Sequence, residues 1–524
     1  MDVAGASTIT CPDGTELPIE WVYPEAPQYE WVLEREHWPG PLTPMERWVW
    51  LNGAPGGDRT WQEAGLEPPP VFYRFQLLGP FLYANATEPP PERIAAMAPG
   101  YMAAGEEYGG AWGMWSQNCE PRIAAACDRL GAMDAGADLR EAAELLFYGF
   151  HQTFTCLGLL FLPGLRLNAL LNEAHVADPE LTSHELTQGG ENATQRIDGE
   201  VWELAEMARR EPAVRAIIER GVEGALPALR AEPRAATFVA AFDDLMRRHG
   251  RRSQGWSLSL ATWAERPESA LALVRAQISR DRVSPEELRA RSARRRRDAM
   301  ERALAAIAVE KHDELRAILA QLEGYVPVRE DRAYWQLVIT GSMRGLLLRA
   351  GAALVSAGRI DRADDILFLT PDEIGRDGAA DLRALVAAER AAWQRWHAFE
   401  PPAVIGTPGK VAEEAAVKRA SLAGSAASRG VVTAPVRILH APDEGDRLQR
   451  GDILVCVMTT PAWTPLFAIA GGVITETGGA LSHPAITARE YGIPAVVALS
   501  GATTRLRDGD IVTIDGATGA VTVH

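Results

Sequence analysis

The chain has 524 residues, of which 47% are hydrophobic and 23% charged, a balance typical of a soluble globular protein with more than one domain. Its formal net charge of −17 disfavours general binding to nucleic acids, because their phosphate backbones repel an acidic surface. The sequence contains no run of about eighteen apolar residues and therefore predicts no membrane span. Its first residues lack the basic start and apolar core of a secretory signal.

Five cysteines are scattered along the chain, and no two of them form a CxxC pair. An odd, dispersed set predicts neither a disulfide framework nor a zinc site. We therefore expect a cytoplasmic protein that holds no metal ion of its own.

The first hundred residues are rich in proline and tryptophan and have little hydrophobic periodicity. Such a segment wraps around a core more often than it forms one. From there to about residue 400, apolar side chains recur at helical spacing. Residues 1–400 are therefore predicted to form a mainly helical domain, with helices over 139–162, 198–220, 235–249, 285–322, 334–357 and 378–399.

The most apolar stretch of this domain is 145–162. It is interrupted by His151, Gln152 and Thr153, three polar side chains that a membrane span would not tolerate easily. The stretch is therefore predicted to be a buried helix.

A run of basic residues follows Ser284 and Pro285, which have the pattern of a capped helix start. The usual interpretation of such a run is a solvated helical face balanced by nearby acids. A docking patch for an acidic partner is the alternative. The run consists of Arg289, Arg291, Arg294, Arg295, Arg296 and Arg297.

The pattern changes after residue 400. Residues 401–429 are rich in glycine, proline and serine and predict a flexible linker, about 20 residues of which would reach at most ~65 Å. Residues 430–524 then show short β-rich runs and one helix, 484–491. The predicted fold is thus α+β and multidomain, ending in a small β/α domain with strands over 431–433, 436–439, 453–455, 472–475, 495–497 and 511–514.

His483 stands at the head of the helix in this small domain, after Gly478, Gly479 and Ser482. A helix N-terminus presents unpaired N–H groups and a partial positive charge, which favour an anion and oppose protonation of an imidazole. His483 would therefore stay a neutral nucleophile, and its phosphorylated form would meet the same N–H donors. Taken alone, a histidine at a helix start is more often a plain surface or capping residue.

The segment 451–519 resembles the swivelling phosphohistidine domain of phosphoenolpyruvate-utilising enzymes, such as phosphoenolpyruvate synthase, pyruvate phosphate dikinase and rifampin phosphotransferase. The resemblance rests on Asp-Ile-Leu-Val at 452–455, Pro-Ala-Trp-Thr-Pro-Leu-Phe at 461–467, the Gly-Gly-x-x-Ser-His core at 478–483 and the Gly-Ile-Pro-Ala-Val run at 492–496. It implies that His483 carries the phosphoryl group and that Gly478, Gly479 and Ser482 bind phosphate.

The helical domain resembles the substrate domain of rifampin phosphotransferase in short segments at 18–21, 37–45, 186–192, 201–205, 249–256 and 329–349. The resemblance implies a phosphate-binding pair of basic residues that begins at Arg329. Here the second position of the pair holds Ala333, and Arg332 is the nearest basic side chain. An ordinary surface arginine at a helix start is an equally open interpretation of Arg329.

Several side chains are candidates for an acceptor pocket. A flat aromatic pocket could be lined by Trp38, Trp112, Trp115 and Trp256. The base towards a substrate hydroxyl could be His37, His151 or His249. Gln188 is a further candidate for contact with the substrate. Each of these residues taken alone more often has a structural role.

The named relatives carry a module that binds nucleotide or phosphoenolpyruvate, and this sequence shows neither an ATP-grasp domain nor a GxxxxGK[ST] loop. We therefore expect ATP and Mg²⁺ to bind on a separate ATP-grasp subunit, as in the split phenylphosphate and methylphenyl phosphate synthases. The expected acceptor is a phenol or another small aromatic alcohol. Two alternatives stay open: a phosphocarrier or regulatory scaffold without an acceptor site, and activation of a carboxylate or an amine.

Overall fold

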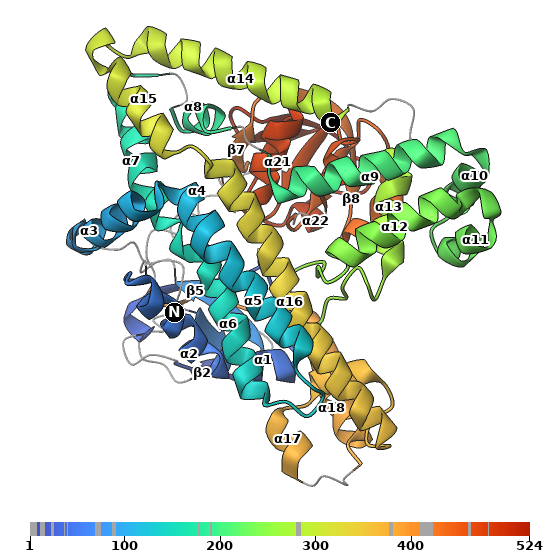
Figure 1. Cartoon of the computed structure of the whole chain (residues 1–524). Coiled ribbons are helices and arrows are strands. Elements are labelled where there is room, and N and C mark those ends of the chain that lie inside the picture. The colour runs from blue at the N-terminus through green and yellow to red at the C-terminus, as the bar shows by residue number, and fades with distance from the viewer. Residues whose placement is uncertain are drawn as a thin grey trace.

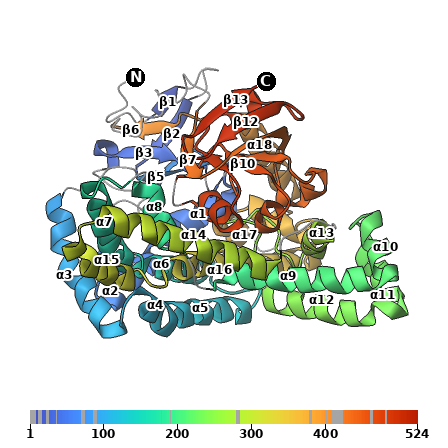
Figure 2. The same cartoon turned by 90° about the horizontal axis from the view of Figure 1, so that it is seen from above.

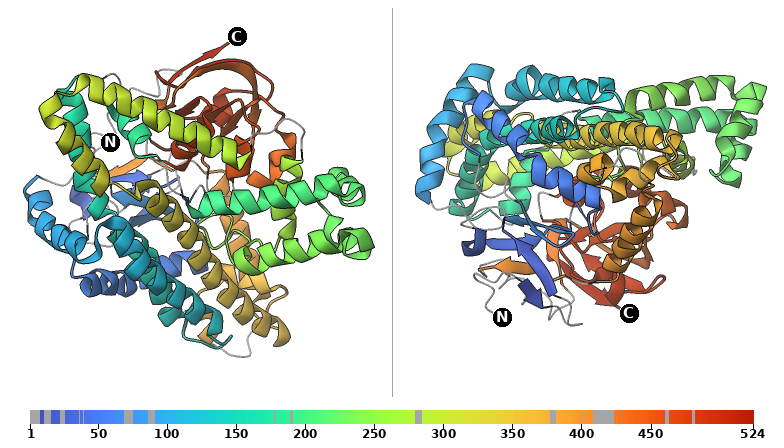
Figure 3. Two further views of the ribbon diagram at one scale, coloured as in Figure 1. Left: turned by 45° about the horizontal axis from the view of Figure 1, so that its top comes forward. Right: turned by 90° about the horizontal axis from the view of Figure 1, so that it is seen from below.

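The structure is a computed structural model in which helices form a broad layer, and the long helix α16 (Tyr325–Ser356) crosses its middle (Figure 1). Two β-sheets lie on the same side of this layer, as the views from above and below show (Figures 2 and 3). The structure describes residues 8–10, 16–21, 26–35, 37–38, 40–68, 75–85, 91–176, 179–188, 191–278, 284–376, 381–399, 401–407, 423–459, 463–479 and 482–524.

The first sheet is built mostly from the N-terminal residues, for which the sequence predicted only an irregular wrap. All of its strands pair antiparallel. One strand comes from the predicted linker, and it ties the end of the helical region back to the N-terminus. The order along the sheet is β1 (Thr8–Thr10), β2 (Glu16–Glu20), β4 (Phe75–Leu78), β5 (Phe81–Asn85), β3 (Glu30–Leu33) and β6 (Val404–Gly406).

The helices expected from periodicity are present, and several are divided by short breaks. The stretch 139–162, for example, forms two helices that meet at Cys156 and Leu157. The helices before α16 are α1 (Pro44–Asn52), α2 (Ala54–Ala64), α3 (Pro91–Tyr108), α4 (Ala111–Met114), α5 (Glu120–Ala132), α6 (Leu139–Thr155), α7 (Gly158–Glu173), α8 (Pro179–Leu186), α9 (Ala193–Arg210), α10 (Pro212–Arg220), α11 (Ala225–Ala231), α12 (Ala236–His249), α13 (Pro267–Gln277), α14 (Pro285–Ala306) and α15 (His312–Gln321); α17 (Pro371–Arg376) and α18 (Arg383–His397) follow it.

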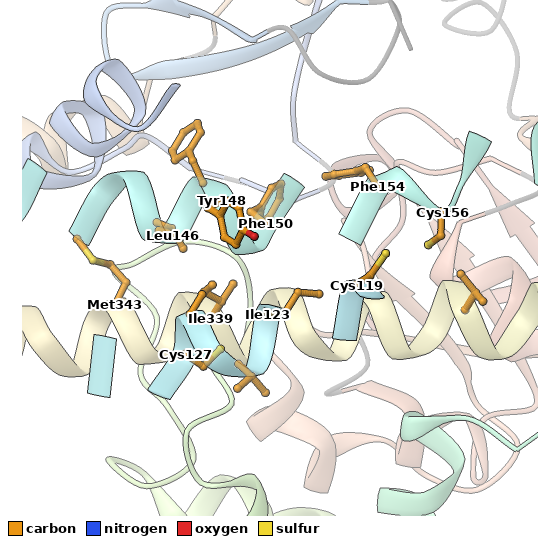
Figure 4. Packing of buried hydrophobic residues seen from close by; sticks show 14 of the residues in the cluster. Cys119, Ile123, Cys127, Leu146, Tyr148, Phe150, Phe154, Cys156, Ile339 and Met343 are labelled. Carbon is orange, nitrogen blue, oxygen red and sulfur yellow. The ribbon is translucent and has the colours of Figure 1, made fainter. Parts of the chain in front are cut away.

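α16 packs against α5 and α6 and forms the centre of the main hydrophobic core. Figure 4 shows Leu146 of α6 and Ile123 of α5 close to Ile339 and Met343 of α16. The predicted buried helix over 145–162 is confirmed for its part in α6, where His151, Gln152 and Thr153 are all buried, whereas Phe161 in α7 is exposed. Two helical stretches, Leu139–Glu173 and Val309–Ser356, have the length and composition of membrane spans, but 50% and 67% of their most apolar windows are buried inside the protein.

α14 begins as the sequence predicts, because the hydroxyl of Ser284 accepts a hydrogen bond from the Glu287 N–H at 3.1 Å. Most of the basic run is a solvated face, and Arg291, for instance, pairs with Glu287 at 2.7 Å. Arg295 is the exception. It is partly buried, and its Nη2 donates a 2.8 Å hydrogen bond to the backbone carbonyl of Glu490 in the C-terminal domain.

The C-terminal domain contains a mixed sheet with apolar cores on both faces. Its four central strands are parallel, and both edges are antiparallel. All predicted strands are present, and the first two form one strand. β7 falls inside the predicted linker, whose segment 408–422 lies outside the described residues. The order is β13 (Ala520–Val523), β12 (Ile511–Asp515), β8 (Val431–Ile438), β9 (Ile453–Cys456), β10 (Gly472–Thr475), β11 (Ala495–Val497) and β7 (Ser425–Ser428).

The C-terminal domain lies against the helical layer (Figures 1 and 3). Its helix α21 (His483–Tyr491) packs on α14, and α20 (Thr464–Phe467) packs on α13. Ala276 of α13 and Leu288 of α14 join the hydrophobic core of the domain. This packing therefore holds α21 at the surface of the helical region.

Candidate active site

His483 lies where two neighbouring parallel strands end. β10 leads to α21, which begins at His483, while β9 leads to Thr459 and Thr464. Because β9 and β10 are adjacent and parallel, their carboxyl ends meet at one edge of the sheet, the usual place for a ligand in such folds. Nδ1 of His483 lies 2.9 Å from the Thr459 hydroxyl. Nε2 lies 3.2 Å from the Thr464 hydroxyl and 3.3 Å from that of Thr487.

The contacts of the ring favour one tautomer. Thr459 bonds the ring through its backbone as well as through its hydroxyl, and this backbone bond raises the pKa of His483, as expected when a carbonyl accepts a ring N–H. A proton on Nδ1 leaves the lone pair of Nε2 towards the hydroxyls of Thr464 and Thr487, which can both donate. Nε2 is therefore the nitrogen suited to attack an electrophile.

The imidazole of His483 is held in its neutral form. Burial, the largest cause, and the positive charge of Arg252 together lower its pKa to about 3. Protein atoms crowd the ring, while the residue as a whole keeps part of its surface exposed. The sequence argument assigned this neutrality to the helix N-terminus, whereas burial is the largest cause.

The turn before α21 requires its glycine. Gly478 has a φ of 101°, and a Cβ there would lie 2.6 Å from the hydroxyl oxygen of Ser482. Ser482 is the N-cap residue, but its hydroxyl donates to the carbonyl of Gly479 at 2.7 Å and makes no capping bond to the helix. No side-chain cap therefore occupies the first N–H groups of α21. Gly492 ends the helix with a φ of 70°, as predicted.

One face of α21 points at the helical region. His483, Thr487 and Tyr491 follow each other at intervals of four residues and so share a face. The hydroxyl of Tyr491 donates a hydrogen bond to Oδ2 of Asp198 on α9. Burial raises the pKa of Asp198 to about 7 and that of Glu490 to about 8. The contact between the two domains thus contains carboxyl groups that retain protons near neutral pH.

The two arginines predicted to bind phosphate lie on α16. Arg329 donates to the hydroxyl of Tyr325 at 3.2 Å, and the guanidinium of Arg332 lies 5.0 Å from the ring centre of Phe154. Neither charge contributes to the pKa shift of His483. The cation that acts on His483 is Arg252, which the sequence placed within a resembling segment without giving it a role.

Three of the predicted acceptor residues do come together. The ring of His37 stacks on Trp256 with centroids 3.4 Å apart, and Trp38 meets Trp256 edge-on at 5.5 Å. Nε1 of Trp38 donates to Glu46, whose pKa burial raises to about 7. These residues belong to an aromatic cluster with Trp50, Phe147 and Phe150 around a cavity of about 20 Å³. Such a cavity has room for about one water molecule.

Two of the remaining candidates have partners elsewhere. His249 lies 3.0 Å from the hydroxyl of Tyr334 and 3.1 Å from Glu200. Gln188 is buried, and its Oε1 accepts a 3.4 Å hydrogen bond from Ser292 of α14. Within the described part of the chain, the hydrogen bonds of these two residues do not join them to His483 or to the aromatic cluster.

Comparison with known families agrees with this geometry. Residues 448–519 match the mobile domain of PEP-utilising enzymes, and residues 156–330 match the fourth domain of rifampicin phosphotransferases. The chain carries a PEP-utiliser mobile domain. His483 and its threonine neighbours all lie in this mobile domain, and Arg252 lies in the stretch that matches the fourth domain.

The sequence is homologous to rifampicin phosphotransferases. It is 32% identical to that of Streptomyces sp over 373 residues, which are 68% of this chain and 42% of that protein. It is 40% identical over 214 residues to the uncharacterized phosphotransferase YvkC of Bacillus subtilis, covering 37% of this chain and 25% of that protein. Chondramide synthase cmdD of Chondromyces crocatus is 27% identical over 98% of this chain and 14% of its own length. The chain therefore spans less than half the length of each of these relatives.

Proposed function

We propose that this protein is a phosphotransferase that works through a phosphohistidine at His483. The observation that carries the proposal is a neutral imidazole, ringed by the hydroxyls of Thr459, Thr464 and Thr487, at the head of α21 in the mobile domain. A neutral imidazole is a nucleophile at physiological pH, which a protonated one is not.

The reaction has two steps. In the first, Nε2 of His483 attacks the phosphorus of a donor, a new P–N bond forms, and the bond from phosphorus to the leaving oxygen breaks. In the second, the oxygen of an acceptor attacks the same phosphorus, a P–O bond forms, and the P–N bond breaks. The acceptor hydroxyl loses its proton to a base, and the imidazole leaves neutral if Nδ1 keeps its proton towards Thr459.

The proposed donor is ATP, bound with Mg²⁺ on a separate ATP-grasp subunit. This part of the proposal rests on the resemblance to split synthases. The proposed acceptor is a phenol or a similar aromatic alcohol. Its support is the aromatic cluster of the helical region, where the buried carboxyl of Glu46 could take a proton from a hydroxyl.

A phosphocarrier without an acceptor site is the second candidate. The specific observation in its favour is the tight packing of the aromatic cluster, because a cavity of about 20 Å³ is too small for a phenol. A phenolic acceptor could enter the cluster only if side chains such as Trp256 and Phe150 moved.

The decisive experiment uses labelled potassium phosphoramidate, a small donor that phosphorylates histidine without a partner subunit. The peptide that contains His483 should gain one acid-labile, base-stable phosphoryl group, and the same peptide of His483→Gln should gain none. Full labelling of this peptide in His483→Gln would overturn the proposal. Addition of phenols to the labelled protein then separates the two candidates: a phenyl phosphate product supports an acceptor site, and release of inorganic phosphate alone supports the carrier.

A further inference from the structure

We propose that Arg252 binds the phosphoryl group on His483 and thereby makes the docking of the mobile domain depend on phosphorylation. The proposal rests on the proposed function, because it requires a phosphoryl group at His483. The proposal goes beyond that function, because it names a residue of the helical region that would recognise the phosphorylated mobile domain.

Arg252 is a buried cation with unused hydrogen-bond donors. Its side chain is 1% exposed, and neither Nε nor Nη2 has a hydrogen-bond partner among the described residues. Burial lowers the pKa of Arg252 to about 10, so the guanidinium remains charged at neutral pH. A buried charged group without hydrogen-bond partners is costly, and such groups usually have partners. A ligand with oxygen acceptors would remove this cost.

The backbone holds Arg252 in place. Its carbonyl accepts a 3.1 Å hydrogen bond from the Trp263 N–H, and the next residue, Ser253, donates to the Leu337 carbonyl of α16 at 3.1 Å. The guanidinium lies 4.9 Å from the ring centre of Trp263, which supports one of its faces. The group is therefore fixed in position before a ligand arrives.

The surroundings of Arg252 place it at the docking contact. Its charge interacts with that of Asp198 on α9, with Glu330 and Tyr334 on α16, and with His483 on α21. Asp198 is in turn bonded to Tyr491, two turns along α21 from His483. Arg252 thus lies where α9, α16 and the His483 face of α21 meet.

The charges around Arg252 suit a phosphoryl group. Burial raises the pKa of Asp198 and of Glu330 to about 7, so neither carboxyl fully neutralises the guanidinium near neutral pH. A planar guanidinium with two free N–H groups matches the oxygens of a phosphoryl group. A fixed cation also stabilises the charge that develops when phosphorus is transferred.

Arg252 should stabilise one form of His483 in the docked state much more than the other. The unmodified imidazole is neutral and gains little from a nearby cation, whereas a phosphoryl dianion is attracted to it. The phosphorylated mobile domain should therefore dock more tightly than the free one, and transfer of the phosphoryl group should weaken the contact. Since coupling is reciprocal, docking should also stabilise the phosphohistidine.

The experiment compares four proteins before and after treatment with potassium phosphoramidate: the unaltered chain, Arg252→Met, Arg252→Lys and Arg251→Met. Arg251 is the matched control, because it is the neighbouring residue and pairs with Asp128 at an exposed site. Hydrogen exchange is followed in α9 and α21. Phosphorylation should slow exchange there by at least about fivefold in the unaltered chain and in Arg251→Met. The effect should vanish in Arg252→Met and be reduced in Arg252→Lys, which keeps the charge but loses the planar donors.

A second measurement does not depend on docking. The phosphorus NMR signal of phosphorylated His483 should titrate at a lower pH in the unaltered chain than in Arg252→Met, because a nearby cation favours the dianion. Equal protection and equal titration in the two proteins would overturn the role of Arg252. A chain that takes no phosphoryl group on His483 would instead overturn the proposed function, so the two failures are distinguishable. If Arg252→Met does not fold, Arg252→Lys decides between them.

Discussion

Replacing Gly341 with alanine is expected to destabilise the protein by about 3 kcal/mol or more. A Cβ at this position of α16 would lie 1.8 Å from the backbone carbonyl oxygen of Arg251. A backbone atom cannot rotate away as a side chain can, and the bond from Ser253 to the Leu337 carbonyl holds the same loop against the helix one turn earlier. The free energy of unfolding, measured with urea, checks this expectation.

Gly345 provides the matched control, since it lies one turn further along α16. A Cβ there would meet only Nη1 of Arg349, at 3.7 Å, which is ordinary van der Waals contact with a flexible side chain. Gly345→Ala should therefore stabilise the protein by about 0.5–1 kcal/mol, the usual gain of alanine over glycine inside a helix. Equal stability of the two variants would show that α16 does not press against the loop that carries Arg252.

The sequence predicted the elements whose signal is local. The strand Ile453–Cys456 is buried on both faces, so it is a continuous apolar run. The helix His483–Tyr491 is delimited by its own proline and glycines. The N-terminal sheet escaped prediction because its strands are short and lie among prolines and tryptophans. Its strand β3 pairs with β6, which lies more than three hundred residues away. No local sequence pattern predicts such a partner.

The residues of the candidate site also differ in whether their signal is local in the sequence. His483 could be predicted because its glycines, serine and proline are its neighbours in sequence. Arg252 could not, since its burial and its unused donors arise only when α9, α16, α21 and Trp263 come together. Trp38 and Trp256 were anticipated as parts of an aromatic pocket and His37 as a separate candidate base, but the volume left between them depends on side chains from other helices.

Docking of the mobile domain is expected to weaken as the pH rises through about 7. Burial raises the pKa of Asp198 from its usual 3.8 to about 7. Because Tyr491 of the mobile domain contacts this carboxyl, we expect its pKa to return towards the ordinary value when the domains separate. The docked state therefore binds the proton more tightly. The stability that protonated Asp198 contributes to the docked state is fully present below about pH 4 and is lost as the pH rises through about 7. A shift of this size corresponds to roughly 4 kcal/mol at most. Glu490, with a pKa raised to about 8, acts in the same direction.

His483 titrates in the opposite sense, because burial lowers its pKa to about 3 and the docked state thus favours its neutral form. Asp198→Asn separates the two contributions, since both proteins retain His483. The amide imitates the protonated carboxyl and can still accept the bond from Tyr491. At pH 5.5 the two proteins should show similar hydrogen exchange in α21. At pH 8.5 exchange should become faster in the unaltered chain than in the variant. Identical pH profiles would mean that Asp198 titrates alike in both states, and the carboxyl would then not bury its proton at the contact between the domains.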